Sequence, residues 1–140
     1  MKLEQLGEFN HEPMPDPEIV DICCVTSNKI GYALVACRGK YNGSYLVSLS
    51  LATLKFAVVL NLNNPYAKIS KIGTNSKYVF VGLDLSGVLI FELPNFESPI
   101  GRIPLSSSIR DLRFNKETQS LMVLEEDGQG RQTLSIFRVK

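Results

Sequence analysis

The chain has 140 residues, of which 44% are hydrophobic and 21% are charged, and its formal net charge is +1. This length and balance fit about one globular domain with an apolar core. A net charge so close to zero excludes a basic surface over the whole chain, so nucleic-acid binding is not expected. No run approaches the roughly 20 apolar residues of a membrane helix, so membrane insertion is not expected either.

Cysteine and histidine usage argues against a disulfide framework and against a zinc site. The three cysteines are Cys23, Cys24 and Cys37, and the single histidine is His11. Adjacent cysteines in a strand point to opposite faces, so Cys23 and Cys24 cannot both meet Cys37 on one face. The N-terminus has no apolar core of signal-peptide length. We therefore expect reduced thiols in an intracellular protein, either cytoplasmic or nuclear.

The first predicted element is an amphipathic strand at about residues 2–10, followed by a proline-rich link. From residue 18 onward the apolar residues come in short runs of period two, and Val, Ile, Leu, Tyr and Phe dominate these runs. Such runs are typical of strands. Regular turn signals between them indicate an all-β sandwich, barrel or propeller.

Three units of strand, turn, strand, turn and strand can be aligned along the chain, at about residues 18–62, 66–105 and 107–140. Their first strands contain Ile19-Val20-Asp21-Ile22, Ile69-Ser70-Lys71-Ile72 and Ile109-Arg110-Asp111-Leu112. The period of about 40–50 residues lies in the range of propeller blades.

A propeller blade has four strands, the last of them outermost. The first unit supplies a fourth strand at residues 54–60 and the second supplies one near residues 98–103, whereas the third unit supplies none. We therefore expect the N-terminal strand to complete the last blade.

The third strands of the units carry a resemblance to a known family. Gly87-Val88-Leu89-Ile90-Phe91-Glu92-Leu93 and Ile136-Phe137-Arg138-Val139 are similar to strand ends of the WD40-type β-propeller repeat. In that family the place of Phe91 or Phe137 is often a Trp followed by Asp. This chain has no Trp and lacks the Gly-His pair that opens the family's repeats. The resemblance implies a propeller of antiparallel four-stranded blades and a general binding role, and it assigns no functional residue.

Three blades are fewer than the roughly four to eight of a typical propeller. The chain could be a half-propeller that self-associates, with the strand at residues 3–9 of each copy completing the other. Another protein could supply the remaining blades, or the chain could be a fragment of a longer propeller. A fourth reading is a compact sandwich or barrel in which the repeats are only hairpin periodicity.

The sequence shows no convergent set of catalytic residues. His11 lies in a link, and no Gly-x-Ser-x-Gly elbow is present. Residues 73–77 faintly resemble a phosphate loop and residues 125–130 a cation loop, but both are better explained as hairpin turns. Lys71, Arg110 and Arg113 are expected near the channel of a propeller, mostly in local ion pairs. We expect no enzyme activity, no cofactor and no bound metal.

The sequence is most consistent with a non-catalytic protein–protein interaction scaffold whose partner is another protein or a second copy of itself. Exposed apolar residues on outer strands and aromatic residues on the rim would contact the partner, because aromatic side chains bury much area at low entropic cost. These candidates are Leu3, Leu6, Phe9, Tyr41, Phe56, Val58, Tyr66 and Phe96. The alternative is a small-ligand-binding or hydrolytic propeller with a pocket at the channel or between protomers.

Overall fold

The computed structural model describes residues 1–8, 18–27, 29–39, 43–64 and 67–140. In these ranges the protein is all-β, with three antiparallel sheets and no helix, as the periodicity predicts. The first sheet contains β1 (Glu18–Ser27), β2 (Ile30–Arg38), β3 (Ser44–Ser50) and β4 (Phe56–Leu62). The second contains β5 (Ile69–Thr74), β6 (Tyr78–Leu83), β7 (Gly87–Glu92) and β8 (Gly101–Ile103). The third contains β9 (Ser108–Asn115), β10 (Ser120–Glu126) and β11 (Gln132–Arg138).

Each sheet is a meander in which neighbouring strands follow one another in the chain. Short polar turns connect the strands, and side chains close several of them locally. In the β5–β6 turn, Asn75 Oδ1 accepts the backbone N–H groups of Lys77 and Tyr78 at 3.0 and 2.7 Å. In the β9–β10 turn, Asn115 Oδ1 accepts the N–H groups of residues 117 and 118 in the same way. Asn and Asp favour turns for this reason.

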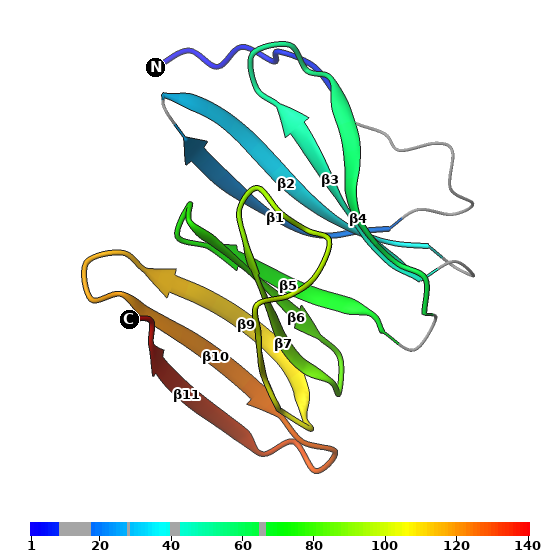
Figure 1. The fold of residues 1–140 in the computed structure, drawn as a ribbon, viewed down its shortest axis with the longest axis vertical. Helices are drawn as coiled ribbons and strands as arrows, with labels where there is room; N and C mark the ends of the chain where they lie inside the picture. The colour runs from blue at the N-terminus through cyan, green and yellow to red at the C-terminus, as the bar shows by residue number, and fades with distance from the viewer. Residues whose placement is uncertain (9–17, 28, 40–42, 65–66) are drawn as a thin grey trace.

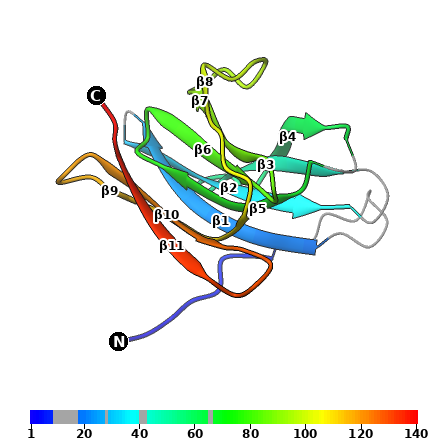
Figure 2. The ribbon, with the colours of Figure 1, turned by 90° about the horizontal axis from the view of Figure 1, so that it is seen from below.

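The three sheets lie side by side, with the second between the other two (Figure 1). β1 packs beside β5, and β5 packs beside β9, so the first strands of the three sheets form one row. Figure 2 shows the same row from below, with the sheets fanning away from it. The structure thus places the equivalent strand of each sheet at the same side of the molecule, and none of the sheets is closed on itself.

Two apolar clusters hold the sheets together. The cluster between the first and second sheets includes Leu34, Ala36, Leu46, Ile69 and Ile72, all buried. A second cluster, between the second and third sheets, includes the buried residues Phe80, Val88, Ile109, Leu112, Leu121 and Val123. The ring of Phe80 stacks on that of Phe114, with centroids 5.7 Å apart. The core is therefore made of interfaces between sheets, and the middle sheet contributes to both.

The first strand of every sheet carries the same irregularity. The pairing register shifts between Ile19 and Asp21 in β1, between Ile69 and Lys71 in β5, and between Ile109 and Asp111 in β9. The bulge recurs at the same position in three strands, so it is a structural repeat. A bulge changes the direction of the side chains that follow it, so those side chains point the same way in all three strands. We therefore treat the three first strands as equivalent position by position.

The N-terminal segment differs from the prediction of an outer strand at residues 2–10. Residues 1–8 form no strand, and residues 9 and 10 lie outside the described residues. A Cβ placed on Gly7 would lie 2.7 Å from Cδ1 of Leu54, so this segment lies beside the β3–β4 turn and not beside β11. The sequence explains the difference: Leu3 and Leu6 are three residues apart, and a strand would turn them to opposite faces. In the described residues β11 pairs with β10 alone.

Candidate functional site

A shallow groove of about 290 Å³ runs along the row of first strands. Its charged lining comes from equivalent positions of the three sheets: Asp21 from β1, Lys71 from β5, and Asp111 with Arg113 from β9. The sequence prediction placed Lys71, Arg110 and Arg113 near the channel of a propeller. The structure puts Lys71 and Arg113 in this groove. Arg110 lies elsewhere, with its Nε donating to Glu126 Oε2 at 2.6 Å.

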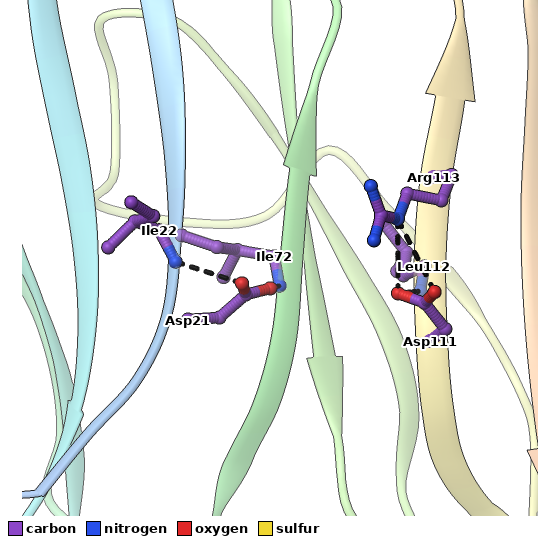
Figure 3. A network of polar contacts seen from close by, with 6 residues as sticks. All are labelled: Asp21, Ile22, Ile72, Asp111, Leu112 and Arg113. Carbon is purple, nitrogen blue, oxygen red and sulfur yellow. Dashed lines mark hydrogen bonds and ion pairs between the residues drawn. The ribbon is translucent and has the colours of Figure 1, made fainter.

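Asp21 joins the first sheet to the second (Figure 3). Its Oδ1 accepts the backbone N–H of Ile22 at 2.9 Å, and its Oδ2 accepts the backbone N–H of Ile72 at 2.9 Å. The bulge turns the carboxylate toward the neighbouring strand, where the amide of Ile72 points at it. One side chain thus satisfies two backbone donors on two sheets.

Asp111 occupies the same position on the third sheet and makes the same local bond. Its Oδ1 accepts the backbone N–H of Leu112 at 2.9 Å. Both carboxylate oxygens also accept from Nε of Arg113, at 3.3 Å each (Figure 3). The pairing is local, as the sequence predicts for these charges. Asp111 thus bonds within its own strand, whereas Asp21 reaches across to the next sheet.

Exchanging Asp21 for asparagine is expected to weaken the contact between the first two sheets. The amide group of the Asp21→Asn variant retains one acceptor oxygen, so it cannot accept from Ile22 and Ile72 with separate oxygens. Hydrogen bonds to charged groups contribute about 1.5–3 kcal/mol, so we expect a loss of that order in the free energy of unfolding, measured by urea denaturation. The matched control, Asp111→Asn, loses only bonds within its own strand and should cost less. An equal loss in both variants would contradict the bridging role of Asp21.

Arg38 and Ser44 make a second polar connection between the first and second sheets, at the far end of β5. Arg38 Nε donates to the carbonyl oxygen of Ile69 at 2.7 Å, and its Nη2 donates to Asp84 Oδ2 at 3.2 Å. The buried Oγ of Ser44 accepts the backbone N–H of Ile69 at 2.9 Å. Side chains from the first sheet therefore satisfy both backbone groups of Ile69, so burying this residue leaves its backbone fully paired.

The third sheet has one face against the second sheet and one exposed face. The apolar residues of the exposed face alternate along β10 and β11 with those that point into the core. They are Met122, Leu124, Leu134 and Ile136, of which Leu134 and Ile136 are 58% and 65% exposed. The corresponding face of the second sheet carries Phe80, Gly82, Val88 and Ile90, and there Val88 is 0% exposed because the third sheet covers it.

The predicted contact residues are spread over several parts of the molecule, and the structure does not gather them into one surface. Leu3 and Leu6 are exposed in the N-terminal segment, and Phe56 and Val58 are exposed on β4. Phe96 packs on Phe91, with ring centroids 5.5 Å apart, and so belongs to the core between the first two sheets. The remaining three, Phe9, Tyr41 and Tyr66, lie outside the described residues.

Sequence reasoning did not select the exposed apolar residues of β1 and β11. These are Ile19, Ile22, Leu134 and Ile136. A signal was available, because the aligned positions of the second unit are apolar too. This pattern predicts an apolar face on each sheet, but it does not predict which of these faces is left uncovered by a neighbouring sheet.

Two observations on the described residues concern metal binding and thiol chemistry. No group of three or more His, Cys, Asp or Glu side chains among them is placed to hold a metal ion. Burial raises the pKa of the Cys23 thiol to about 12, and the nearby charges of Asp21 and Cys24 contribute to the rise. Burial also raises the pKa of Cys37. Both thiols stay protonated at neutral pH, which disfavours a nucleophilic role.

The two loops with a faint resemblance to ligand sites are hairpin turns. Residues 73–77 comprise the end of β5 and the turn into β6, and residues 125–130 comprise the end of β10 and most of the turn into β11. In the second turn Asp127 Oδ1 accepts the backbone N–H groups of Gln129 and Arg131 at 2.8 and 3.0 Å. This carboxylate oxygen is occupied by its own turn. In the part of the chain that the structure describes, no helix is long and apolar enough to span a membrane.

Comparison with known proteins gives no family: neither the protein-family models nor the curated proteins contain a match to this chain.

Proposed function

We propose that the protein is a non-catalytic protein–protein interaction scaffold. In this proposal the three sheets are blades of an incomplete propeller of the WD40 type, and a second copy or a partner subunit completes it. The observation that carries the proposal is the uncovered face of the third sheet. It has the apolar character of the face that the second sheet buries, and the edge strand β11 beside it pairs with β10 alone among the described residues.

An uncovered apolar sheet face next to an open strand edge favours association. Contiguous exposed apolar patches mark interaction sites, and an unpaired edge offers backbone donors and acceptors to another strand. The charges of this face lie at its border: Asp111 pairs with Arg113, Glu126 pairs with Arg110, and Arg138 stands at the end of β11. A partner can therefore cover the centre of the face without desolvating an unpaired charge.

The groove along the first strands gives less support to the alternative of a small-ligand-binding or hydrolytic protein. Its volume is about 290 Å³, and two other open hollows of the described residues measure about 490 Å³ each, so the chemistry of the lining, and not the volume, bears on this alternative. The oxygens of Asp21 and Asp111 are engaged with backbone amides and Arg113, so they are already satisfied within the fold.

The proposal is tested by mass and by stoichiometric capture. We expect light scattering after size-exclusion chromatography, at micromolar concentrations, to give a mass above the 15.6 kDa of one chain. If the purified chain alone has the mass of one copy, affinity purification of the tagged chain from its source cells should recover one protein in stoichiometric amount. Leu134→Lys is the matched variant, because it charges the exposed face without touching the core. The proposal would be contradicted if the folded chain is monomeric and captures no partner. It would also be contradicted if a monomeric chain captures a partner that the Leu134→Lys variant still captures.

A further inference from the structure

The first strand of the first sheet exposes residues that its counterparts bury. Ile19 and Ile22 are 49% and 63% exposed, whereas the equivalent Ile69 and Ile72 of β5 are 0% and 3% exposed. On β9 the equivalent Ile109 and Leu112 are also buried. In β5 and β9 these two positions are covered by the preceding sheet. β1 has the same apolar residues at the same bulge, but no sheet precedes it in the described residues.

The interface between the second and third sheets shows what the residues at these two positions contact. A Cβ placed on Gly82 would lie 3.1 Å from Cδ1 of Ile109, and one placed on Gly73 would lie 2.5 Å from Cδ2 of Leu112. The two isoleucine or leucine side chains of a first strand thus sit directly on the preceding sheet. By the common bulge and pairing, the third-sheet residues equivalent to Gly82 and Gly73 are Leu124 and Arg113.

The edge of the interface between the first and second sheets also carries complementary charges. Arg38, Asp84 and Glu126 are equivalent, since each follows the residue that pairs with Ile19, Ile69 or Ile109. Between the first and second sheets, Arg38 forms an ion pair with Asp84. Glu126 pairs with Arg110 within one chain. If the first sheet of another copy packed on the third sheet, its Arg38 would lie near Glu126 at the edge of the contact.

We propose that the exposed face of the third sheet binds the first sheet of a second copy of this chain. The contact would use the strands that meet between the first and second sheets and between the second and third. The two sheets would lie farther apart than within one chain, because Leu124 and Arg113 stand where Gly82 and Gly73 allow close approach. Ile19 and Ile22 of the second copy would lie over Leu124 and the aliphatic part of Arg113, with Glu126 at the edge of the contact. The inference rests on the proposed function, and it names a second copy of the chain as the partner that covers the exposed face of the third sheet.

A second copy is the favoured occupant because the chain itself displays both halves of the interface. One half is uncovered on β10 and β11, and the other is uncovered on β1, and the same two halves already meet twice within each chain. The buried cluster of Val35, Cys37, Tyr45 and Val47 on the first sheet is already covered in one chain. The docking area of the first sheet is therefore centred on the exposed residues of β1.

The contact is tested by cross-linking two variants of different size. One tagged chain carries Leu124→Cys and one untagged chain carries Ile19→Cys, each with Cys24→Ser to remove the exposed native thiol. A short bismaleimide should join the two chains in a mixture and should not join either variant to itself. The control replaces Leu124→Cys by Ile100→Cys, an exposed position outside the proposed contact, and should give no product.

Association should also fall when β1 is charged. We expect Ile22→Lys to weaken self-association at least about tenfold, measured by light scattering over a concentration series, since an uncompensated charge in an apolar contact costs more than about 1.4 kcal/mol. Its unfolding midpoint should be unchanged because Ile22 is exposed in one chain. The chain could have a mass above that of one copy and yet give no cross-link between residues 19 and 124 and no effect of Ile22→Lys. That result overturns this contact and leaves the proposed function standing. A monomeric mass at every concentration overturns the contact, and the proposed function then depends on partner capture.

Discussion

Replacing Ile69 by alanine is expected to lower the free energy of unfolding by about 2–5 kcal/mol. Ile69 is fully buried between the first and second sheets, where it packs in the cluster with Leu34, Ala36 and Leu46. The Ile69→Ala variant removes apolar contacts and leaves a cavity that the flanking sheets can fill only in part. Its backbone bonds to Ser44 and Arg38 remain, so the loss reports side-chain packing alone.

The equivalent exposed residue of β1 provides a control of identical chemistry. Ile19→Ala removes the same atoms from the same position of the repeat, but Ile19 is about half exposed. We expect a loss below about 1 kcal/mol, because the substitution lies away from a core. Urea denaturation at low protein concentration measures both variants without a contribution from self-association. If Ile19→Ala cost as much as Ile69→Ala, β1 would be covered within one chain, and the proposed contact with a second copy would lose its basis.

The strand periodicity and the turn signals predict the three units of strands, although β2, β3 and β6 are buried over several consecutive residues and do not alternate. The three aligned segments at Ile19, Ile69 and Ile109 become the first strands of three sheets, with the bulge at the same position in each. The N-terminal segment lacks the period-two pattern of a strand, since Leu3 and Leu6 are three residues apart. Its position near Leu54 depends on a tertiary contact that no local pattern contains.

The candidate site is less predictable than the fold because it depends on what covers each sheet. Val88 and Leu134 occupy equivalent places in their sheets, yet one is buried and the other exposed. The sequence pattern is apolar at both. The difference arises because the third sheet covers Val88, whereas no sheet of the described residues covers Leu134. The bond from the amide of Ile72 to Asp21 spans 51 residues and depends on the relative position of two sheets. The sequence shows the aspartate but not its distant donor.

Replacing Gly87 by alanine is expected to have an effect as large as the loss of Ile69. Gly87 begins β7 with a φ of +85°, a conformation that costs an L-residue about 1–2 kcal/mol. A Cβ there would also lie 2.1 Å from the carbonyl oxygen of Ile103 and 2.9 Å from the backbone nitrogen of Leu105. Both are backbone atoms, so β8 would have to move away from β7. Overpacking of this kind adds about 1–3 kcal/mol, which gives an expected loss of about 2–5 kcal/mol in total.

Two further glycines separate the conformational cost from the steric cost. Gly130 has a φ of +78°, but an added Cβ would meet no atom within 4 Å, so Gly130→Ala should cost only about 1–2 kcal/mol. Gly128 has neither a positive φ nor a close neighbour, so Gly128→Ala should lie within about 0.5 kcal/mol of the parent. Thermal or urea unfolding of the three variants should therefore rank Gly87 above Gly130 and Gly130 above Gly128. Equal losses at Gly87 and Gly130 would mean that β8 yields without cost, and that the fourth strand of the second sheet contributes little to the fold. A larger loss at Gly87 would show instead that this strand is held firmly, as the outer strand of a stable four-stranded sheet must be.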